Sequence, residues 1–283
     1  MTLFASVGEV RGLGPVDLPA VERMLAEDPV THCFVTSRVR AGGLDPWRTG
    51  GELLGFTDDD GLRSMLHCGA NLVPVCTTEA ARDAFASRLR GTGRRSSSIV
   101  GPQEEVLGLW SLLQQRWGAA RDVRACQPLL VIDHEPRTVP DPCVRPATLQ
   151  DLDLLVPACV AMFTEEVGVS PVAGGMHAAY RARIAELIST GRSFVRIDNG
   201  VVVFKAEIGA ATSSACQVQG VWVNPQFRGR GLSVPGMAAV VEWSRSTIAP
   251  VVSLYVNDYN TAARRCYEAV GFRDHGLFAT VLF

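Results

Sequence analysis

The sequence lacks the cysteine and histidine patterns that mark metal centres or disulfide frameworks. Its 283 residues include eight cysteines, yet they form no C-x-x-C pair and no Cys/His spacing typical of a metal site. The sequence also opens without a secretory signal pattern, because Met1–Arg11 carries Glu9 and only a short apolar run. These absences predict a cytoplasmic protein with reduced, mostly buried thiols and no bound metal.

Long apolar runs and a strong net charge are also missing. No window approaches the roughly 18 uninterrupted apolar residues of a membrane span. The net charge of −2 leaves no broad basic surface for nucleic acid. With 47% hydrophobic and 20% charged residues, the composition is that of a globular protein with an ample core. We therefore expect neither a membrane nor a nucleic-acid partner.

Proline is concentrated in one segment, His134–Pro146, which carries four of these residues within thirteen positions. Proline at this density blocks helices and interrupts sheet ladders. We therefore divide the chain near residue 138, into an N-terminal domain of residues 1–137 and a C-terminal domain of residues 138–283.

The C-terminal half shows a mixed α/β order. A strong turn signal, Asp198-Asn199-Gly200, predicts a hairpin between two of its strands. The expected strands are Val144–Arg145, Ser193–Ile197, Val201–Ile208, Cys216–Val223, Val251–Val256 and Phe278–Phe283. The expected helices are 151–163, Met176–Thr190, Leu232–Ser246 and Thr261–Val270.

The N-terminal half repeats this order more faintly. Its expected strands are Glu52–Phe56, Leu62–Cys68, Asn71–Cys76, Ser97–Val100 and Pro128–Ile132. Its expected helices are Leu18–Ala26, Glu79–Leu89 and Glu104–Arg116. Three strands, a helix, a strand, a helix and a strand occur in both halves, which favours a tandem of two similar folds. Coincidence is the alternative, since short α/β patterns are common.

The most informative segment is Val221–Ser233, VWVNPQFRGRGLS. It predicts a strand, a loop rich in arginine and glycine, and the start of a helix. Gly229 and Gly231 allow close backbone approach, and Arg228 and Arg230 supply positive charge. The unpaired N–H groups at a helix start attract anions. The loop therefore predicts a pyrophosphate site, with an ordinary surface turn as the alternative.

A second motif follows in Leu254–Phe272, LYVNDYNTAARRCYEAVGF. Asn260 stands where a helix N-cap is expected, and asparagine is among the best capping residues. Thr261–Val270 then predicts a short helix, and Gly271 suits the position after its end.

Taken together, R-G-R-G-L-S followed by N-x-x-A-x-x-x-Y-x-x-x-G-F resembles the GNAT superfamily of acyl-CoA-dependent N-acyltransferases. The resemblance extends from near Val144 to the C-terminus. It implies a central mixed, mostly antiparallel sheet with a splayed parallel strand pair, flanked by helices. It also implies acetyl-CoA as co-substrate and a primary amine, on a small molecule or a peptide, as acceptor. The sequence leaves open a homodimer.

The N-terminal half lacks this fingerprint. After Asn71–Cys76 comes Thr77–Arg82, which has no R-G-x-G loop, and Glu79 would repel phosphate. We therefore expect a tandem in which the N-terminal half is a degenerate GNAT-like copy and the C-terminal half holds one acyl-CoA site.

The resemblance assigns cofactor contacts residue by residue. The splayed strands would be Cys216–Val223 and Val251–Val256, and a backbone N–H near Val221–Trp222 would polarise the thioester carbonyl. Ser233 departs from the Gly or Ala that the family usually has, and its hydroxyl would face a phosphate or cap the helix. The expected cofactor-binding residues are Val221, Trp222, Val223, Arg228, Gly229, Arg230, Gly231, Leu232, Ser233 and Asn260.

Two residues are the catalytic candidates. Tyr267 matches the family's general acid near the departing sulfur; a boundary tyrosine packed on the sheet is the alternative. The strand segment CQVQGVWV has no acid, so Glu207 on the neighbouring strand is the first candidate for the general base. Its alternative is a solvent-facing residue beside Lys205, on the same face by period two. Glu165, Glu166 and His177 flank a turn-rich segment and are expected at the surface.

These features leave three functional hypotheses. The first is an N-acetyltransferase, and the second is a non-catalytic acyl-CoA binding or sensing module, which needs no base. The third, a dinucleotide-binding oxidoreductase, requires G-x-G-x-x-G, and R-G-R-G-L-S lacks its third glycine. Trp222 would limit the acyl chain or simply fill the core.

Overall fold

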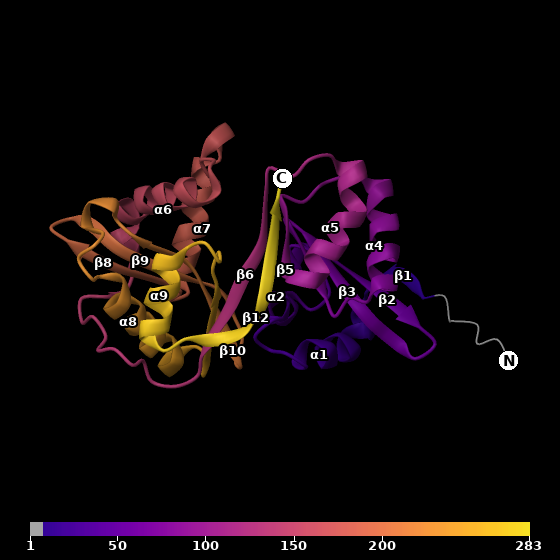
Figure 1. Cartoon of the computed structure of the whole chain (residues 1–283), viewed down its shortest axis with the longest axis horizontal. Coiled ribbons are helices and arrows are strands. Elements are labelled where there is room, and N and C mark those ends of the chain that lie inside the picture. The colour runs from indigo at the N-terminus through magenta and orange to yellow at the C-terminus, as the bar shows by residue number, and fades with distance from the viewer. Residues whose placement is uncertain (1–7) are drawn as a thin grey trace. The chain divides into compact units, whose positions relative to one another are not determined.

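The computed structural model describes residues 8–283, which form two compact units (Figure 1). Of the described residues, unit 1 contains residues 8–129, Tyr255–Tyr259 and Asp274–Phe283, and unit 2 contains Leu130–Leu254 and Asn260–Arg273. Residues 1–7, on which part of the targeting prediction rests, lie outside the described residues. The functional division into residues 1–137 and 138–283 stays a prediction.

Unit 1 is a mixed sheet with helices on both faces. Its strands are β1 (Glu9–Gly12), β2 (Gly51–Asp58), β3 (Gly61–Gly69), β4 (Asn71–Val75), β5 (Ser98–Pro102), most of β6 (Asp122–Ile132) and nearly all of β12 (Arg273–Leu282). Its helices are α1 (Leu18–Ala26), α2 (Cys33–Gly42), α3 (Pro46–Thr49), α4 (Glu79–Thr92) and α5 (Gln103–Trp117), with a 3₁₀ turn at Pro15–Asp17. Neighbouring strands follow the order β1-β2-β3-β4-β5-β12-β6, and β4 with β5 is a parallel pair.

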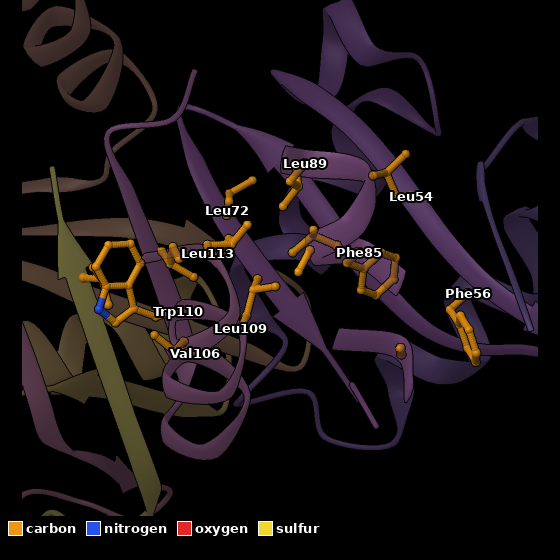
Figure 2. Packing of buried hydrophobic residues seen from close by; sticks show 14 of the residues in the cluster. Leu54, Phe56, Leu72, Phe85, Leu89, Val106, Leu109, Trp110 and Leu113 are labelled. Carbon is orange, nitrogen blue, oxygen red and sulfur yellow. The ribbon is translucent and has the colours of Figure 1, made fainter. Parts of the chain in front are cut away.

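Period-two alternation divides the unit 1 core between the two faces of its sheet. Leu54 and Leu72 point to the face covered by α4 and α5, where Phe85 and Leu109 complete the packing (Figure 2). Leu53, one position away, points to the opposite face with side chains of α1 and α2. Helix α2 is not among the expected elements, because its sequence, CFVTSRVRAG, shows weak apolar periodicity.

A buried histidine lies on the α1/α2 face of this sheet. His67 is 2% exposed, and its ring meets Phe34 edge-on at 5.7 Å between centroids. The backbone of Thr49 and Asn71 approaches the ring without reaching hydrogen-bond geometry. Burial lowers the pKa of His67, and this nearby backbone offsets only part of that effect. The folded state therefore favours the neutral imidazole.

This histidine should make unit 1 less stable in mild acid. The unfolded chain binds a proton near the ordinary pKa of about 6.5, whereas folded His67 does so only at lower pH. Neutral His67 therefore makes its full contribution to the free energy of unfolding above a pH of about 6.5. Below that pH the contribution is lost, by up to about 1.4 kcal/mol per pH unit, until folded His67 itself binds a proton. Hydrogen exchange of β3 amides across this range measures it. His67→Leu should flatten the dependence, and His177→Leu, an exposed control, should not.

Unit 2 is also built from parallel and antiparallel strands with flanking helices. Its strands are β7 (Arg145–Pro146), β8 (Ser193–Asp198), β9 (Val201–Ala211), β10 (Ala215–Val223) and most of β11 (Val251–Tyr255). Its helices are α6 (Leu152–Val167), α7 (His177–Ser189), α8 (Ser233–Thr247) and α9 (Thr261–Val270), with 3₁₀ turns at Leu149–Asp151, Ala173–Gly175 and Pro225–Phe227. The order is β11-β10-β9-β8-β7, and β10 with β11 is the parallel pair.

Helices cover both faces of the unit 2 sheet. Side chains of α6 and α7 pack on Val195, Val202 and Trp222. On the other face α8 approaches β9 closely, because Gly236 has no side chain and the ring of Phe204 fills that space. The strands of each unit are thus mixed and mostly antiparallel, with a parallel pair and flanking helices, which confirms the expected fold class.

Candidate functional site

The parallel strands of unit 2 share only a short stretch of pairing. Within the described residues their register runs from Ala215↔Val251 to Gln217↔Ser253. β10 then continues to Val223 with β9 as its recorded partner. The pair therefore has the splayed form expected for Cys216–Val223 and Val251–Val256.

A bulge interrupts β10 beside this opening. Its register against β9 jumps from Gln219↔Glu207 to Trp222↔Lys205, so two residues of β10 oppose one of β9. Gly220 lies in the bulge with φ 59°, a left-handed conformation that favours glycine. Gly220 is not among the residues expected at the site. One feature of the sequence could have pointed to Gly220, because a glycine inside a strand pattern often marks a bulge.

The arginine-glycine loop leads from β10 into α8. Gly229 and Gly231 both have φ 75°, and a Cβ at either would meet open space. Helix α8 begins at Ser233, and Leu232 at its N-cap position provides no side-chain hydrogen bond. The first N–H groups of α8 therefore lack a capping side chain, and the positive end of the helix dipole lies there. Backbone of this kind suits an anion.

The two loop arginines already have protein partners. Arg228 pairs with Glu165 at 2.7 Å and donates from Nε to the carbonyl of Val223 at 3.1 Å. Arg230 stacks on Phe227, with Cζ 4.8 Å from the ring centroid. Both guanidinium groups are exposed, so an incoming phosphate would compete with these contacts.

Glu165 therefore has a defined role in the loop. Besides pairing with Arg228, it accepts a hydrogen bond from the indole N–H of Trp222 at 3.3 Å. The hydrogen bond from Arg228 lowers the pKa of Glu165, although partial burial opposes this. Glu165 is half exposed, and Glu166 and His177 are exposed, as expected. Trp222 is buried in the core with α6, while Val221 and Val223 are half-buried on the same strand.

Helix α9 forms with the expected caps. The side chain of Asn260 accepts from the N–H of Ala263 at 3.1 Å, and Gly271 ends the helix with φ 115°. Ser233 provides no cap; its hydroxyl faces the thiol of Cys266 on α9. α9 thereby lies against the start of α8.

Tyr267 lies on the buried face of α9. It is 7% exposed, and its ring meets Phe272 at 5.8 Å between centroids. Burial raises the pKa of Tyr267 well above its usual range, and the nearby Cys266 and Glu166 add to this. The hydroxyl therefore stays protonated at neutral pH.

Glu207 does not face the solvent, which was the alternative to a role as general base. It is 7% exposed, and its Oε1 lies 2.5 Å from Nζ of Lys205, which is fully buried. A Cβ built on Gly220 would lie 3.1 Å from the same oxygen. Glu207 thus lies directly against the bulge of β10. The reason is that α6 covers this part of β9, which period two alone does not indicate.

The corresponding place in unit 1 is closed by the protein itself. The N–H and hydroxyl of Thr77, just before α4, donate to Glu105 at 2.7 and 2.8 Å. Burial raises the pKa of Glu105, and these hydrogen bonds oppose it. Thr78 caps α4 by accepting from the N–H of Ala81. A carboxylate and a capped helix thus stand where unit 2 has an uncapped helix start.

No helix among residues 8–283 is both long and apolar enough to cross a membrane. In the same part of the chain, His, Cys, Asp and Glu side chains do not gather in groups of three or more that would suit a metal ion.

Comparisons with known proteins agree with this geometry. Residues 163–272 match the family model "Acetyltransferase (GNAT) family", and residues 51–155 match "Domain of unknown function (DUF4081)". No curated protein matches the sequence.

Several solved structures share the fold along nearly the full length. A GNAT-family acetyltransferase from Colwellia psychrerythraea is 11% identical, with TM-score 0.56 and coverage of 97% of this chain and 99% of that one. A GCN5-related N-acetyltransferase from Sphaerobacter thermophilus is 15% identical, with TM-score 0.60 and coverage of 98% and 95%. A tandem GNAT protein from the clavulanic acid biosynthesis pathway is 13% identical, with TM-score 0.57 and coverage of 97% and 98%.

At these identities the likeness shows the fold, and the tandem neighbour agrees with the repeated order of elements. The fold and the family match together support acyl transfer from acyl-CoA. Residues 163–272 thus match the GNAT acetyltransferase family model and follow an N-terminal match to DUF4081, which is consistent with a tandem arrangement.

Proposed function

We propose that the protein is an N-acetyltransferase that transfers the acetyl group of acetyl-CoA to a primary amine. The observation that carries this is the uncapped start of α8 behind two left-handed glycines, next to the splayed end of β10. The backbone N–H groups of this loop would hold the pyrophosphate, with Arg228 and Arg230 turning toward it. Asn260 would contact the cofactor from the start of α9.

The transfer needs one proton acceptor and one proton donor. The amine nitrogen would form a bond to the thioester carbon while the carbon–sulfur bond breaks. Glu207 would take the proton that the amine loses, and Tyr267 would supply one to the departing sulfur. A backbone N–H near Val221–Trp222 would stabilise the charge on the carbonyl oxygen, an effect typically worth about 3 kcal/mol.

The proposal includes one site per chain. Glu105 and the capped start of α4 leave unit 1 without the N–H groups that an anion needs. The acceptor, a small-molecule or peptide amine, stays a prediction, as do the cytoplasmic location and a homodimer. We likewise predict that the protein uses no metal and binds neither nucleic acid nor a membrane.

Two glycines provide a matched test of the loop. Gly231 and Gly200 have φ 75° and 76°, and a Cβ at either would meet open space. Valine at either position should cost about 1–2 kcal/mol of unfolding free energy, because the left-handed conformation disfavours a side chain. Gly200 lies in the β8–β9 turn, so only Gly231→Val should weaken acetyl-CoA binding, by at least about tenfold.

Calorimetric titration with acetyl-CoA measures both the affinity and the number of sites. If Gly231→Val bound acetyl-CoA with unchanged affinity, the arginine-glycine loop would not be part of the cofactor site. Two equivalent sites per chain would contradict the assignment of unit 1.

A non-catalytic acyl-CoA binding module is the second candidate. The pairing of Glu207 with Lys205 favours it, because the proposed base already has a partner. Release of free thiol from acetyl-CoA in the presence of primary amines, after subtraction of hydrolysis, distinguishes an enzyme from a binding module.

A further inference from the structure

Lys205 is the one lysine in the sequence, among 27 basic residues that are otherwise arginine. It is 0% exposed, in the middle of β9. A buried ammonium is expensive unless it is paired, and the cost is several kcal/mol per ion even after relaxation. Arginine has a larger, planar guanidinium head, so the two residues are not interchangeable at a packed site. A chain that uses arginine everywhere else thus has lysine at its most buried cationic position.

The partner of Lys205 is the carboxylate proposed as the base. By period two, Lys205 and Glu207 share one face of β9, and Nζ lies 2.5 Å from Oε1. The thiol of Cys159 on α6 also faces Oε1, at 3.8 Å. Among residues 8–283, both donors to this carboxylate use Oε1, which leaves Oε2 to take a proton.

The titratable groups around this carboxylate come from three elements. They are Lys205 on β9, Cys159 on α6 and Tyr180 on α7, whose hydroxyl donates to the carbonyl of Cys159 at 3.3 Å. Burial raises the pKa of Cys159 to about 11 and also raises that of Tyr180. For Lys205, burial opposes the charge, but Glu207 and Cys159 outweigh it and raise the pKa. Lys205 is therefore the charged neighbour of Glu207 at neutral pH.

The pair also touches the bulge. A Cβ on Gly220 would lie 3.1 Å from Oε1 of Glu207 and 3.2 Å from Nζ of Lys205. We expect the thioester carbonyl to bind at the backbone of this bulge. The carboxylate of Glu207 would therefore lie beside the reacting group.

We propose that Lys205 is a positioning residue, which keeps the carboxylate of Glu207 ionised inside the fold and fixed against the β10 bulge, with Oε2 free to accept the proton of the acceptor amine. This rests on the proposed function for its catalytic consequence, but the pairing can be tested without any acceptor. Without Lys205, burial would disfavour the charged form of a carboxyl at this depth, with no opposite charge beside it.

The first experiment follows the ionisation of Glu207 by carbon NMR of labelled glutamate carboxyls, with Glu207→Gln to assign the signal. In Lys205→Met, which keeps the length and volume of the side chain, the pH at which Glu207 titrates should rise by at least about 2 units. If Glu207 titrated at the same pH in Lys205→Met as in the wild type, the proposal would be overturned.

The second experiment uses the unmodified lysine and needs no Lys205 variant. Because the chain has one lysine, isotope labelling of lysine Nζ gives a single resonance that reports its charge. The ammonium should persist to above about pH 10 in the wild type and lose its proton at lower pH in Glu207→Gln. An unchanged lysine titration in that variant would also overturn the pairing.

The functional consequence has its own readout. For the best primary amine of a panel, the acidic limb of the kcat/KM profile should move to higher pH in Lys205→Met, while the KM for acetyl-CoA stays unchanged. If the NMR shifts occur but Glu207→Gln retains wild-type turnover, Lys205 holds the carboxylate as proposed and the base assignment is wrong. If acetyl-CoA does not bind the wild type, the proposed function fails regardless of the NMR result.

Discussion

Deleting residues 274–283 is expected to unfold unit 1, although this segment is the C-terminal end of the chain. These residues form nearly all of β12, which pairs antiparallel with β5 from Phe278↔Pro102 to Leu282↔Ser98. On the other edge of β12, the hydroxyl of Thr280 donates to Gln127 at 2.6 Å. β12 is therefore an inner strand of the unit 1 sheet, and its removal would expose unpaired backbone on both sides.

Side-chain packing points to the same result. Ala279 and Val281 are 0% exposed and belong to the cluster under α4 and α5. An aspartate at position 281 would place an unpaired charge among Phe85, Leu109 and Trp110. We expect Val281→Asp to lower the free energy of unfolding of unit 1 by about 4 kcal/mol or more, a loss that only severe changes in a core produce.

The matched control is on the same strand. Leu277 is 46% exposed, so Leu277→Asp should change stability by no more than about 0.5 kcal/mol. Hydrogen exchange read by mass spectrometry separates peptides of the two units. Val281→Asp should remove protection from β4, β5 and α5. Full protection of these elements after deletion of residues 274–283 would show that unit 1 does not depend on β12.

Local signals were sufficient where a structure depends on a few neighbouring residues. Asn260 caps α9 as expected, and Gly271 adopts the left-handed conformation after it. Asn199 and Gly200 both have positive φ, as the turn signal between β8 and β9 predicts. Each of these features is set by residues within one or two turns of the chain.

The pairing of β12 could not be predicted in this way. Apolar residues at its end indicate a strand, but they do not specify whether its partner is nearby or, like Ile99, far away in the chain. The burial of Lys205 was also missed, because charged side chains are rarely buried. Two signals were nevertheless present: a single lysine in the whole sequence, and Gly220 inside a strand pattern.

Replacing Tyr267 by phenylalanine is the second change for which we expect a large effect. It removes one hydroxyl and keeps the ring that packs on Phe272. Since burial holds the pKa of Tyr267 above its usual range, the hydroxyl remains a donor at every pH at which the protein is assayed. The alkaline limb of the rate profile should therefore not arise from Tyr267.

Energetics restrict how this donor acts. An ordinary phenol has a pKa of about 10 and a thiol of about 8.5, so full transfer of the proton to a free thiolate is uphill by about 2 kcal/mol. Burial of Tyr267 increases that cost. We therefore expect Tyr267 to stabilise the sulfur by hydrogen bonding, or to donate only as the carbon–sulfur bond breaks.

The expected result is a loss confined to turnover. General-acid assistance is typically worth about 10²- to 10⁴-fold, and we expect Tyr267→Phe to lower kcat by at least the smaller factor. The affinity for acetyl-CoA should stay within about twofold, because the hydroxyl acts on the sulfur only as its bond breaks. Thiol release with primary amines gives kcat, and calorimetry gives the affinity. Tyr259→Phe, at a 68% exposed position, controls for the loss of a phenol as such. Wild-type turnover in Tyr267→Phe would make Tyr267 a packing residue, and loss of affinity with unchanged turnover would place it in cofactor binding instead.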